Sequence, residues 1–458
     1  MNGDGDLDRA VAADVNPELG KEALDLDLAH VFHSWSAQAG RTPWVIAGGQ
    51  GSYVWDFEGN RYLDFSSQLV NTNIGHQHPV VVEAIAEQAR TLTTIAPQHV
   101  NLARSRAARD IVALAPGNMN KVFFTNGGAD AIENAIRMAR LHTNRTKVLS
   151  FYRSYHGNTG SAINATGDPR RWPNEFAHGH VHFFGPHVYR SHFHSASAEE
   201  EAQRALEHLA DVIAFEGPST IACIVLESVV GTAGIITPPP GYLAGVKALC
   251  EQHGIVYIAD EVMAGFGRTG RWFAFEHFDV QPDLIVFAKG VNSGYLPLGG
   301  IIISDDIAAT FDSRVFPGGL TYSGHPLACA SAVATIKVMQ DEGIVENSAR
   351  IGEQVLGPGL RALADKHQVI GDVRGLGTFW CLDLVMDRST KEPLAPYGGS
   401  SPAMAALVEA CKSNGLMPFT NYNRLHVVPP LNISDADARE GLSRLDKALE
   451  SISSYYKG

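Results

Sequence analysis

Two charged side chains stand at the ends of consecutive apolar runs. Asp260 closes GIVYIAD (254–260), and Lys289 closes the run LIVFA in DLIVFAKG (283–290). A lysine beside such an apolar run costs free energy unless it is paired, bound to a ligand or neutral. The alternative is a solvated charge at a strand end. If the two runs are neighbouring strands, an amine that can form a Schiff base lies beside a carboxylate.

A possible phosphate site lies upstream in FFTNGGADAIENAIRMAR (123–140). An apolar run leads into Gly127, Gly128 and Ala129 and then directly into an amphipathic helical pattern. The N-terminus of such a helix offers free N–H groups and a positive dipole end, and glycines let a phosphate approach the backbone. The alternative is that the glycines only cap the helix. No lysine follows them as in a nucleoside triphosphate site.

Lysine, strand-end aspartate and phosphate cradle together indicate pyridoxal phosphate. The lysine would bind the aldehyde of this cofactor, and the aspartate would keep the pyridine nitrogen protonated, so that the ring takes up electrons. A competing hypothesis is a nicotinamide-dependent oxidoreductase that uses the G-x-G-x-x-G of residues 265–270. Bulky aromatics and Pro282 follow that loop, and the carboxylates of Asp260 and Glu261 would repel a pyrophosphate. We therefore predict a glycine-rich surface turn there, with Glu261 in a structural role.

The elements that position these residues follow an α/β pattern. Apolar runs without polar alternation, separated by helical patterns, predict a mostly parallel sheet covered by helices on both faces. The predicted strands are 121–126, 147–152, 221–228, 254–260, 283–290 and 299–304, and the predicted helices include 129–143, 198–213 and 241–253. Ligands bind such sheets beyond the carboxyl ends of their strands.

The chain divides into four predicted segments. Residues 1–25 are polar and acidic and are expected to form a flexible arm, and 26–75 begin a small domain that includes a β-hairpin with its turn at Gly59-Asn60. The large cofactor-binding domain is predicted over 76–330. Residues 331–458 are expected to complete the smaller α+β domain.

Composition excludes several function classes. The net charge is −13 without a Lys/Arg run, which argues against nucleic acid and anionic membranes as partners. No apolar run is long enough for a membrane span, and the N-terminus lacks the pattern of a secretory signal. The five cysteines are widely spaced, which favours reduced thiols and a cytoplasmic location over disulfides or a zinc site.

The sequence resembles the class III (omega-type) aminotransferases of the fold-type-I pyridoxal-phosphate enzymes. The resemblance spans roughly residues 30–450 and rests on motifs in matching order and spacing. They are VWDFEGNRYLDF, NIGHQHPVVVEAI, FFTNGGADAIENAIRMAR, SYHGNT, LESVVGTAGIITPP, IADEVMAGFGRTG, PDLIVFAKG, GYLPLGG and TYSGHPLACASA. SQLVN, HSWSAQ and TNGGADAIE are most similar to the taurine and β-amino acid branch.

The resemblance implies a role for each matching residue. Lys289 would bind the cofactor aldehyde and shuttle the proton, and Asp260 would pair with the pyridinium nitrogen. Tyr155 and Val262 would pack on the two ring faces. The remaining implied cofactor-binding residues are Gly127, Gly128, Ala129, His156, Glu227 and Thr321, with Thr321 reaching the phosphate of a neighbouring subunit. The resemblance thus implies an obligate homodimer with shared sites, and it leaves a tetramer open.

The implied reaction moves an amino group from an amine or an ω- or β-amino acid to an oxo acid such as pyruvate or 2-oxoglutarate, with ping-pong kinetics. Decarboxylation, racemisation and amino mutation share Lys289 and Asp260, so they remain alternatives.

Substrate residues depart from the family pattern. The arginine positions that clamp substrate acids in this family fall near Phe419 and near His426 or Val427. Arg424 is the nearest arginine, with substrate contact and surface placement both open, and Arg153 is a second candidate. Leu69 matches a position that often holds tryptophan.

Two further segments are rich in histidine or arginine. The histidines between 178 and 194 fit no tight metal-ligating spacing, so we expect an irregular loop without a metal. Residues 168–173 (DPRRWP) are expected to form a surface turn whose arginines could steer anionic substrates.

Overall fold

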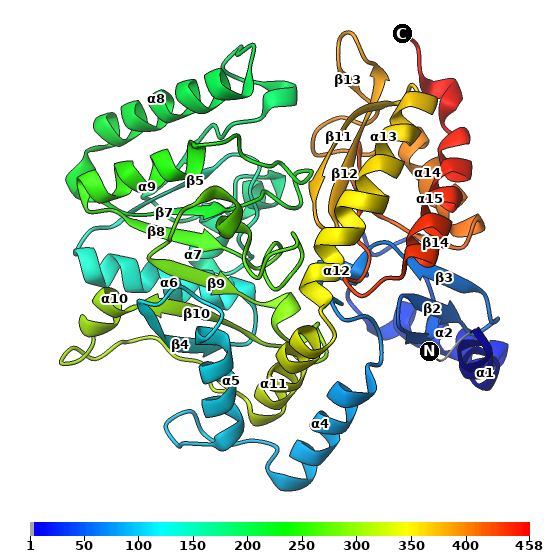
Figure 1. Cartoon of the computed structure of the whole chain (residues 1–458), viewed down its shortest axis with the longest axis horizontal. Coiled ribbons are helices and arrows are strands. Elements are labelled where there is room, and N and C mark those ends of the chain that lie inside the picture. Colours follow the sequence, from blue (N-terminus) through cyan, green and yellow to red (C-terminus); the bar gives the residue numbers. More distant parts are fainter. Residues whose placement is uncertain (1–3) are drawn as a thin grey trace.

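A seven-stranded sheet lies at the centre of the larger body of the molecule (Figure 1). The structure is a computed structural model and describes residues 4–458. The strand order is β4-β10-β9-β8-β7-β5-β6. The strands are β4 (Met119–Thr125), β5 (Lys147–Phe151), β6 (His180–Phe183), β7 (Ile221–Glu227), β8 (Val256–Asp260), β9 (Leu284–Phe287) and β10 (Gly299–Ser304).

The predicted mostly parallel sheet is confirmed. The strands from β9 through β8, β7 and β5 to β6 are parallel, and β10 is antiparallel to both β9 and β4. All six predicted strands are present. The sequence interpretation missed β6, which forms one edge of the sheet inside the histidine-rich segment that we expected to be an irregular loop.

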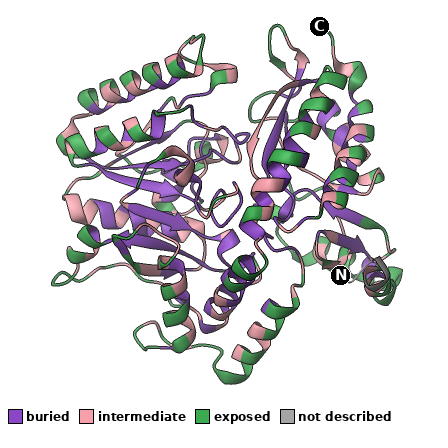
Figure 2. Cartoon of the chain, in the orientation of Figure 1, coloured by how far each residue is buried: buried purple, intermediate pink, exposed green. Residues whose placement is uncertain are grey.

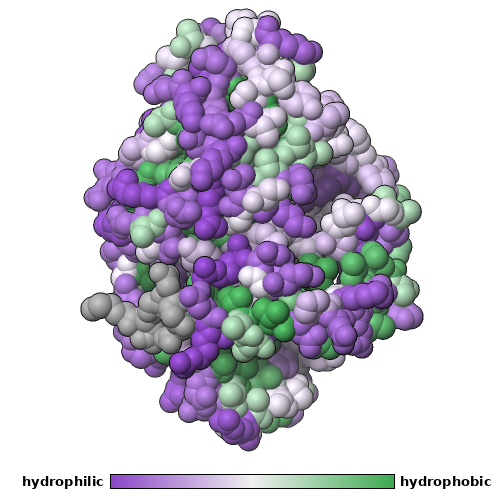
Figure 3. Space-filling view, turned by 90° about the vertical axis from the view of Figure 1, so that its right-hand side faces the viewer, coloured by the Kyte–Doolittle hydropathy of each residue, from purple (hydrophilic) through white to green (hydrophobic). Residues whose placement is uncertain are grey.

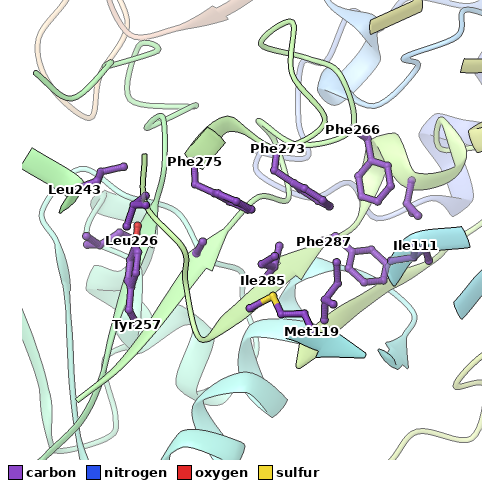
Figure 4. Close-up of a cluster of buried hydrophobic side chains, with 14 of the residues drawn as sticks. Ile111, Met119, Leu226, Leu243, Tyr257, Phe266, Phe273, Phe275, Ile285 and Phe287 are labelled. Carbon is purple, nitrogen blue, oxygen red and sulfur yellow. The ribbon is translucent and has the colours of Figure 1, made fainter. Parts of the chain in front are cut away.

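The central strands are apolar up to their carboxyl ends because helices cover both faces of the sheet. Every residue of β7, β8 and β9 is buried. Successive side chains point to opposite faces, so Leu226 belongs to one hydrophobic cluster and Val225 to another. Figure 4 shows the cluster on the first face, where Phe287 lies near the aromatic rings of Phe266 and Phe273, and Tyr257 lies beside Leu226. The core thus forms a rigid base for the strand ends.

Helices surround this sheet in the arrangement that Figures 1 and 2 show. The helices of this part of the chain are α4 (Pro79–Thr91), α5 (Leu102–Val112), α6 (Gly128–Thr143), α7 (Gly160–Ala165), α8 (Ala198–Glu216), α9 (Tyr242–His253), α10 (Asp305–Ala309) and α11 (Pro326–Asp341). Figure 2 shows that the strands are buried while the helices expose their outer faces. This is the expected amphipathic pattern.

The smaller body combines segments from both ends of the chain. Its strands are β1 (Ile46–Gln50), β2 (Tyr53–Asp56), β3 (Arg61–Asp64), β11 (Ile370–Leu376), β12 (Phe379–Asp387), β13 (Glu392–Pro393), β14 (Leu416–Met417), β15 (Phe419–Asn421) and β16 (Arg424–Val427). Its helices are α3 (Ser67–Val70), α12 (Ile344–Ile351), α13 (Gly357–Lys366), α14 (Pro402–Ser413) and α15 (Asp435–Glu450). Strand β3 pairs with β14, and Leu63 and Phe65 share a core with C-terminal residues. The domain limits proposed from sequence stay a prediction.

The N-terminal segment differs from the expected flexible arm. It forms helices α1 (Asp4–Asp14) and α2 (Pro17–His30). The Trp55 indole N–H donates to Asp14 Oδ2 at 2.9 Å, and a Cβ on Gly20 would lie 2.8 Å from Phe57 Cβ. Acidic composition suggested a solvated arm, but docking onto β2 offsets the entropy of ordering it.

Part of the surface near the N-terminus is apolar. The side chains of Leu26, Phe32 and Trp35 are exposed. On the face drawn in Figure 3, which is otherwise mostly hydrophilic, hydrophobic residues gather in the lower half. None of the helices within residues 4–458 is long and apolar enough to cross a membrane.

Candidate active site

Three charged residues meet at the carboxyl ends of adjacent parallel strands. Glu227 ends β7 and pairs in register with Asp260, which ends β8. Asp260 in turn pairs with Val286 of β9, and Lys289 follows β9 directly. The predicted adjacency of the Asp260 and Lys289 strands is therefore confirmed. Lys289 has a φ of 49°, in the left-handed region that lysine rarely adopts.

A cavity of about 170 Å³ collects these side chains. It is lined by Gly128, Ala129, Tyr155, His156, Gly157, Glu227, Thr232, Asp260, Val262, Met263 and Lys289. The structure thus brings together most of the cofactor residues that the resemblance implied. Gly127 immediately precedes the lining residue Gly128. Leu69, Arg153, Arg424 and Thr321 do not line this cavity.

Asp260 is held by two hydrogen bonds at the cavity wall. His156 Nδ1 lies 2.7 Å from Asp260 Oδ2, and the backbone N–H of Val262 donates to Oδ1 at 3.1 Å. Burial opposes protonation of His156, but its hydrogen bond to Asp260 raises the pKa of this imidazole. The Nε2 atom of His156 is buried and has no hydrogen-bond partner among the described residues. These contacts fix the orientation of the carboxylate.

Lys289 is half-buried, and the desolvation of its amine lowers the pKa of this group to about 8. The negative charges of Asp260 and Glu227 oppose this shift, and the positive charge of Arg170 adds to it. An amine with this pKa is partly neutral near physiological pH, as a nucleophile or base must be.

The N-terminus of α6 fits a phosphate. Gly127 precedes the helix, no side chain caps it, and Gly128 and Ala129 line the cavity. Among residues 4–458, no acceptor lies within hydrogen-bond distance of the N–H groups of Gly128 and Ala129. A Cβ on Gly128 would lie 2.8 Å from Val262 Cγ2, so a larger residue would fill the space. Free N–H groups and the helix dipole favour an anion there.

Two buried glutamates have different surroundings. Glu227 accepts hydrogen bonds from the N–H of Tyr155 at 2.9 Å and of Gly231 at 2.7 Å, and burial raises the pKa of its carboxyl. Glu261 accepts from the N–H of Ala274 at 2.8 Å and does not line the cavity. Glu261 therefore orders the following loop, in agreement with its predicted structural role.

Tyr155 forms one wall of the cavity, and Arg170 stacks on it. The guanidinium carbon of Arg170 lies 3.5 Å from the centre of the Tyr155 ring. Arg170 belongs to a short 3-10 helix, Pro169–Asn174, and it is ion-paired with Asp168. The expected surface turn at 168–173 therefore has a side chain packed on the Tyr155 ring, which no local sequence pattern indicates.

The glycine loop 265–270 is buried rather than a surface turn. Arg268 within it is fully buried and donates to Pro429 O at 2.5 Å, Asn73 Oδ1 at 2.9 Å and Ser67 Oγ at 3.2 Å. Gly267 and Gly270 have φ values of 88° and 84°, which glycine adopts at little cost. The loop joins the two bodies of the molecule, and the N–H groups of its three glycines already donate to backbone carbonyls.

Arg424 and Arg153 lie beside the cavity without acidic partners. Arg424 is 6% exposed, which excludes surface placement, one of the two alternatives left open, and its Nη1 atom is buried without a hydrogen bond to residues 4–458. Arg153 Nη1 lies 3.1 Å from His187 Nδ1, and its guanidinium carbon lies 5.9 Å from the centre of the Tyr397 ring. Burial lowers the pKa of both guanidinium groups, and the charge of Arg424 lowers that of Arg153 further. Within residues 4–458, neither forms an ion pair with a carboxylate.

Neighbouring residues explain why these two arginines stay unpaired. Asp383, the buried carboxylate nearby, is bonded by Arg190 at 2.8 Å and by Arg374 at 3.3 Å. His426, at one of the family's arginine positions, is fully buried, and burial lowers its pKa to about 3. A neutral imidazole cannot replace the charge of an arginine.

Leu69 and Thr321 both lie on the surface. Leu69 is 50% exposed. Its two neighbours have positive φ values, 61° at Gln68 and 59° at Val70. Thr321 is exposed in the segment that leads to α11. Backbone strain of this kind at a β-branched residue such as Val70 is uncommon and concentrates at functional sites.

Three lining residues were missed from the sequence. Thr232 and Met263 follow the carboxyl ends of β7 and β8, a position that in itself marks ligand sites. Gly157 follows His156 with a φ of 130°, and a Cβ there would lie 2.5 Å from Ala129 Cβ. The glycine of the SYHG motif could have indicated that the backbone at Gly157 lies close to another segment.

The histidine-rich segment is ordered by hydrogen bonds. His182 Nε2 lies 3.0 Å from Thr166 O, and the N–H of His187 donates to the buried Glu201 at 2.7 Å. In the part of the chain that the structure describes, no group of three or more histidine, cysteine or acidic residues is arranged to hold a metal ion.

Known proteins are similar to this chain in both sequence and fold. The family model "Aminotransferase class-III" matches residues 35–449. A probable 4-aminobutyrate aminotransferase of Bacillus subtilis is 36% identical over 421 residues, which cover 88% of this chain and 92% of the relative. The taurine–pyruvate aminotransferase of Rhodobacter capsulatus is 34% identical, over 95% of this chain and 98% of the relative.

A solved structure agrees closely. The taurine:2-oxoglutarate aminotransferase of Bifidobacterium kashiwanohense, in complex with PLP and glutamate, superposes with a TM-score of 0.93 at 40% identity. The match covers 96% of this chain and 99% of that one. The lysine, aspartate and helix N-terminus described above also fit this cofactor. The chain therefore belongs to the class III aminotransferases, and it is a pyridoxal-phosphate-dependent enzyme of fold type I.

Proposed function

We propose that this aminotransferase takes its amino group from an ω- or β-amino acid with a terminal acid group, such as taurine, and passes it to pyruvate or 2-oxoglutarate. The observation that carries the proposal is a pair of arginines, the buried Arg424 and the half-buried Arg153, without carboxylate partners within residues 4–458. Relatives that act on taurine and 4-aminobutyrate support the same substrate class.

The arginine pair suits an acid group because a buried guanidinium without a partner is costly. Arg424 has no ion pair, and its Nη1 atom lacks any partner among the described residues. A carboxylate or sulfonate would bind its planar fork in a bidentate, charge-assisted arrangement. The pair also lies close to the cavity, because Asn421, three residues before Arg424, donates to O of the lining residue Thr232 at 2.8 Å.

The cavity residues hold the cofactor in this proposal. Pyridoxal phosphate supplies an aldehyde that takes up the amine and a ring that accepts electrons. The N-terminus of α6 binds the phosphate, and Asp260 holds the proton on the ring nitrogen. Tyr155 and Val262 flank the ring. Lys289 Nζ, partly neutral because of its lowered pKa, would remove the proton from the substrate carbon and return it on the way to the product.

We propose that two chains form a homodimer with shared sites. Val100, Leu102 and Tyr322 expose apolar side chains around Thr321. Their segments adjoin, since a Cβ on Gly324 would lie within contact of the Arg104 side chain. A second copy would cover this surface and receive Thr321 at its phosphate. Five unpaired cysteines support the proposed cytoplasmic location.

Activity against matched donors tests the substrate proposal. Taurine, β-alanine, 4-aminobutyrate and an arylalkylamine are compared with pyruvate and with 2-oxoglutarate as acceptor. Arg424→Gln should raise the KM of acid-bearing donors by about 10- to 100-fold, because it removes charge-assisted hydrogen bonds. The arylalkylamine serves as the control, since it carries no acid group. Equal losses for both donor types, or none, would contradict the role of Arg424.

A further inference from the structure

The ring of Tyr155 is stacked against a cation. Tyr155 lines the cavity, whereas Arg170 does not. The Arg170 guanidinium carbon lies 3.5 Å from the ring centre, so it covers one face of the ring. A cation over an aromatic face is attracted by the ring quadrupole, more strongly where solvent is partly excluded.

Asp168 fixes this guanidinium in place. Arg170 Nε lies 3.1 Å from Asp168 Oδ1 and 3.0 Å from Oδ2, and Arg170 Nη2 also bonds to Oδ2. Asp168 itself is buried, and it accepts from the backbone N–H of Arg170 at 2.9 Å. The stacking partner of Tyr155 is thus oriented in advance, and little side-chain entropy remains to be lost.

The backbone of Tyr155 is held as firmly as its ring. Its N–H donates to Glu227 Oε1 at 2.9 Å from the end of β7. The 3-10 helix that carries Arg170 is in turn covered by the smaller body, because a Cβ on Gly398 would lie 3.3 Å from Pro169 Cγ. The ring therefore has a fixed place in the cavity wall, with Arg170 stacked on it.

We propose that Arg170 is a positioning residue that acts through Tyr155 and sets the affinity of the protein for pyridoxal phosphate. It holds the Tyr155 ring against the space that the cofactor ring takes. Because the phosphate and the amine-binding lysine lie elsewhere in the cavity, Arg170 contributes to retention of the cofactor rather than to binding of the amine.

The test measures the dissociation constant of pyridoxal phosphate by absorbance titration of the apoprotein. Arg170→Met should weaken binding by about 3- to 30-fold, the range of a partly desolvated cation–π contact. Arg170→Lys keeps the charge but loses the planar fork, so its dissociation constant should lie between those of the wild type and Arg170→Met. Arg171→Met is the matched control, since Arg171 lies over Tyr152 and not over Tyr155. It should bind as the wild type does.

A double-mutant cycle shows whether the effect passes through Tyr155. In a Tyr155→Leu background, Arg170→Met should change cofactor affinity no further. An equal loss in that background would overturn the proposal, because Arg170 would then act on the cofactor directly. The proposal would also be overturned if Arg170→Met left the affinity for pyridoxal phosphate unchanged and raised the KM of acidic donors alone. Arg170 would then steer the substrate. If Arg170→Met does not fold, Asp168→Asn should weaken cofactor binding, and unchanged binding would overturn the proposal.

Discussion

At the scale of single residues, Lys289 combines an unfavourable backbone conformation with an unfavourable desolvation of its amine. Its φ of 49° and its lowered pKa of about 8 both cost free energy in the folded protein. Asp260 and Glu227 offset part of that cost without forming a hydrogen bond to the amine. The strain is consistent with a group kept ready to react rather than one selected for stability.

The pKa of Lys289 predicts how stability depends on pH. Its folded value, about 8, lies below the unfolded value of 10.5, so between these pH values the unfolded chain binds the proton that the folded chain lacks. Apoprotein stability from this group therefore rises with pH across that window and is lowest below pH 8. Lys289→Met should stabilise the apoprotein by about 3 kcal/mol at pH 7.

Urea denaturation of both apoproteins between pH 7 and pH 10 checks this expectation. The difference between Lys289→Met and the wild type should shrink as the pH rises, because the wild-type amine loses its charge. A difference that stays constant across this range would show that Lys289 does not titrate in it. Other alkaline groups affect both proteins equally.

At the scale of elements, the loop 265–270 joins the two bodies of the molecule. Burial lowers the pKa of Arg268 to about 9, and the guanidinium is held by neutral acceptors rather than by a carboxylate. Its partners Ser67, Asn73 and Pro429 belong to segments far apart in the sequence. The glycines that resembled a dinucleotide motif let the chain turn closely around this side chain.

Replacement of Arg268 should therefore destabilise the fold. Arg268→Met removes the donors of Pro429 O and Asn73 Oδ1 and leaves these acceptors buried, which should lower the free energy of unfolding by about 3 kcal/mol. Urea denaturation at one protein concentration measures the change. Arg271→Met, an exposed site in the adjoining turn, is the control and should stay within about 0.5 kcal/mol of the wild type. Similar losses for both variants would contradict a specific role of Arg268.

At the scale of the whole molecule, the apolar surface of Val100, Leu102 and Tyr322 has no cover within one chain. Val100 is 88% exposed. Apolar residues that gather around an exposed candidate phosphate ligand, Thr321, favour an interface over scattered surface residues. The proposed dimer would complete each cavity with a residue of the other chain.

Val100→Glu should weaken this dimer, because it places a charge in the proposed interface. Sedimentation at several protein concentrations should show more monomer than in the wild type, and the monomer should retain less pyridoxal phosphate. Phe215→Glu is the matched control, since Phe215 is 89% exposed on α8 outside the proposed interface. Its dimerisation should be unchanged. If Val100→Glu leaves the dimer unchanged, the interface must lie elsewhere on the surface.

The sequence by itself determined the strands and the chemistry at their ends. Runs such as LIVFA and IVYIA are apolar at every position, which only a sheet buried on both faces explains, and parallel strands bring their carboxyl ends to one edge. Lys289 and Asp260 could thus be placed together from local pattern, whereas Glu227 was indicated only by the family resemblance. The glycines before α6 indicated the phosphate site for the same reason, because a helix N-terminus is a local feature.

Tertiary structure alone decided the residues that act across the sequence. Arg170 stacks on Tyr155, Arg268 joins three distant segments, and Arg424 is buried without an ion pair to any carboxylate of residues 4–458. In the sequence, each of these arginines stands among polar residues or glycines that are equally typical of a surface. Whether an arginine is solvated or buried depends on which distant groups pack around it, and that packing is not recorded in its neighbours along the chain.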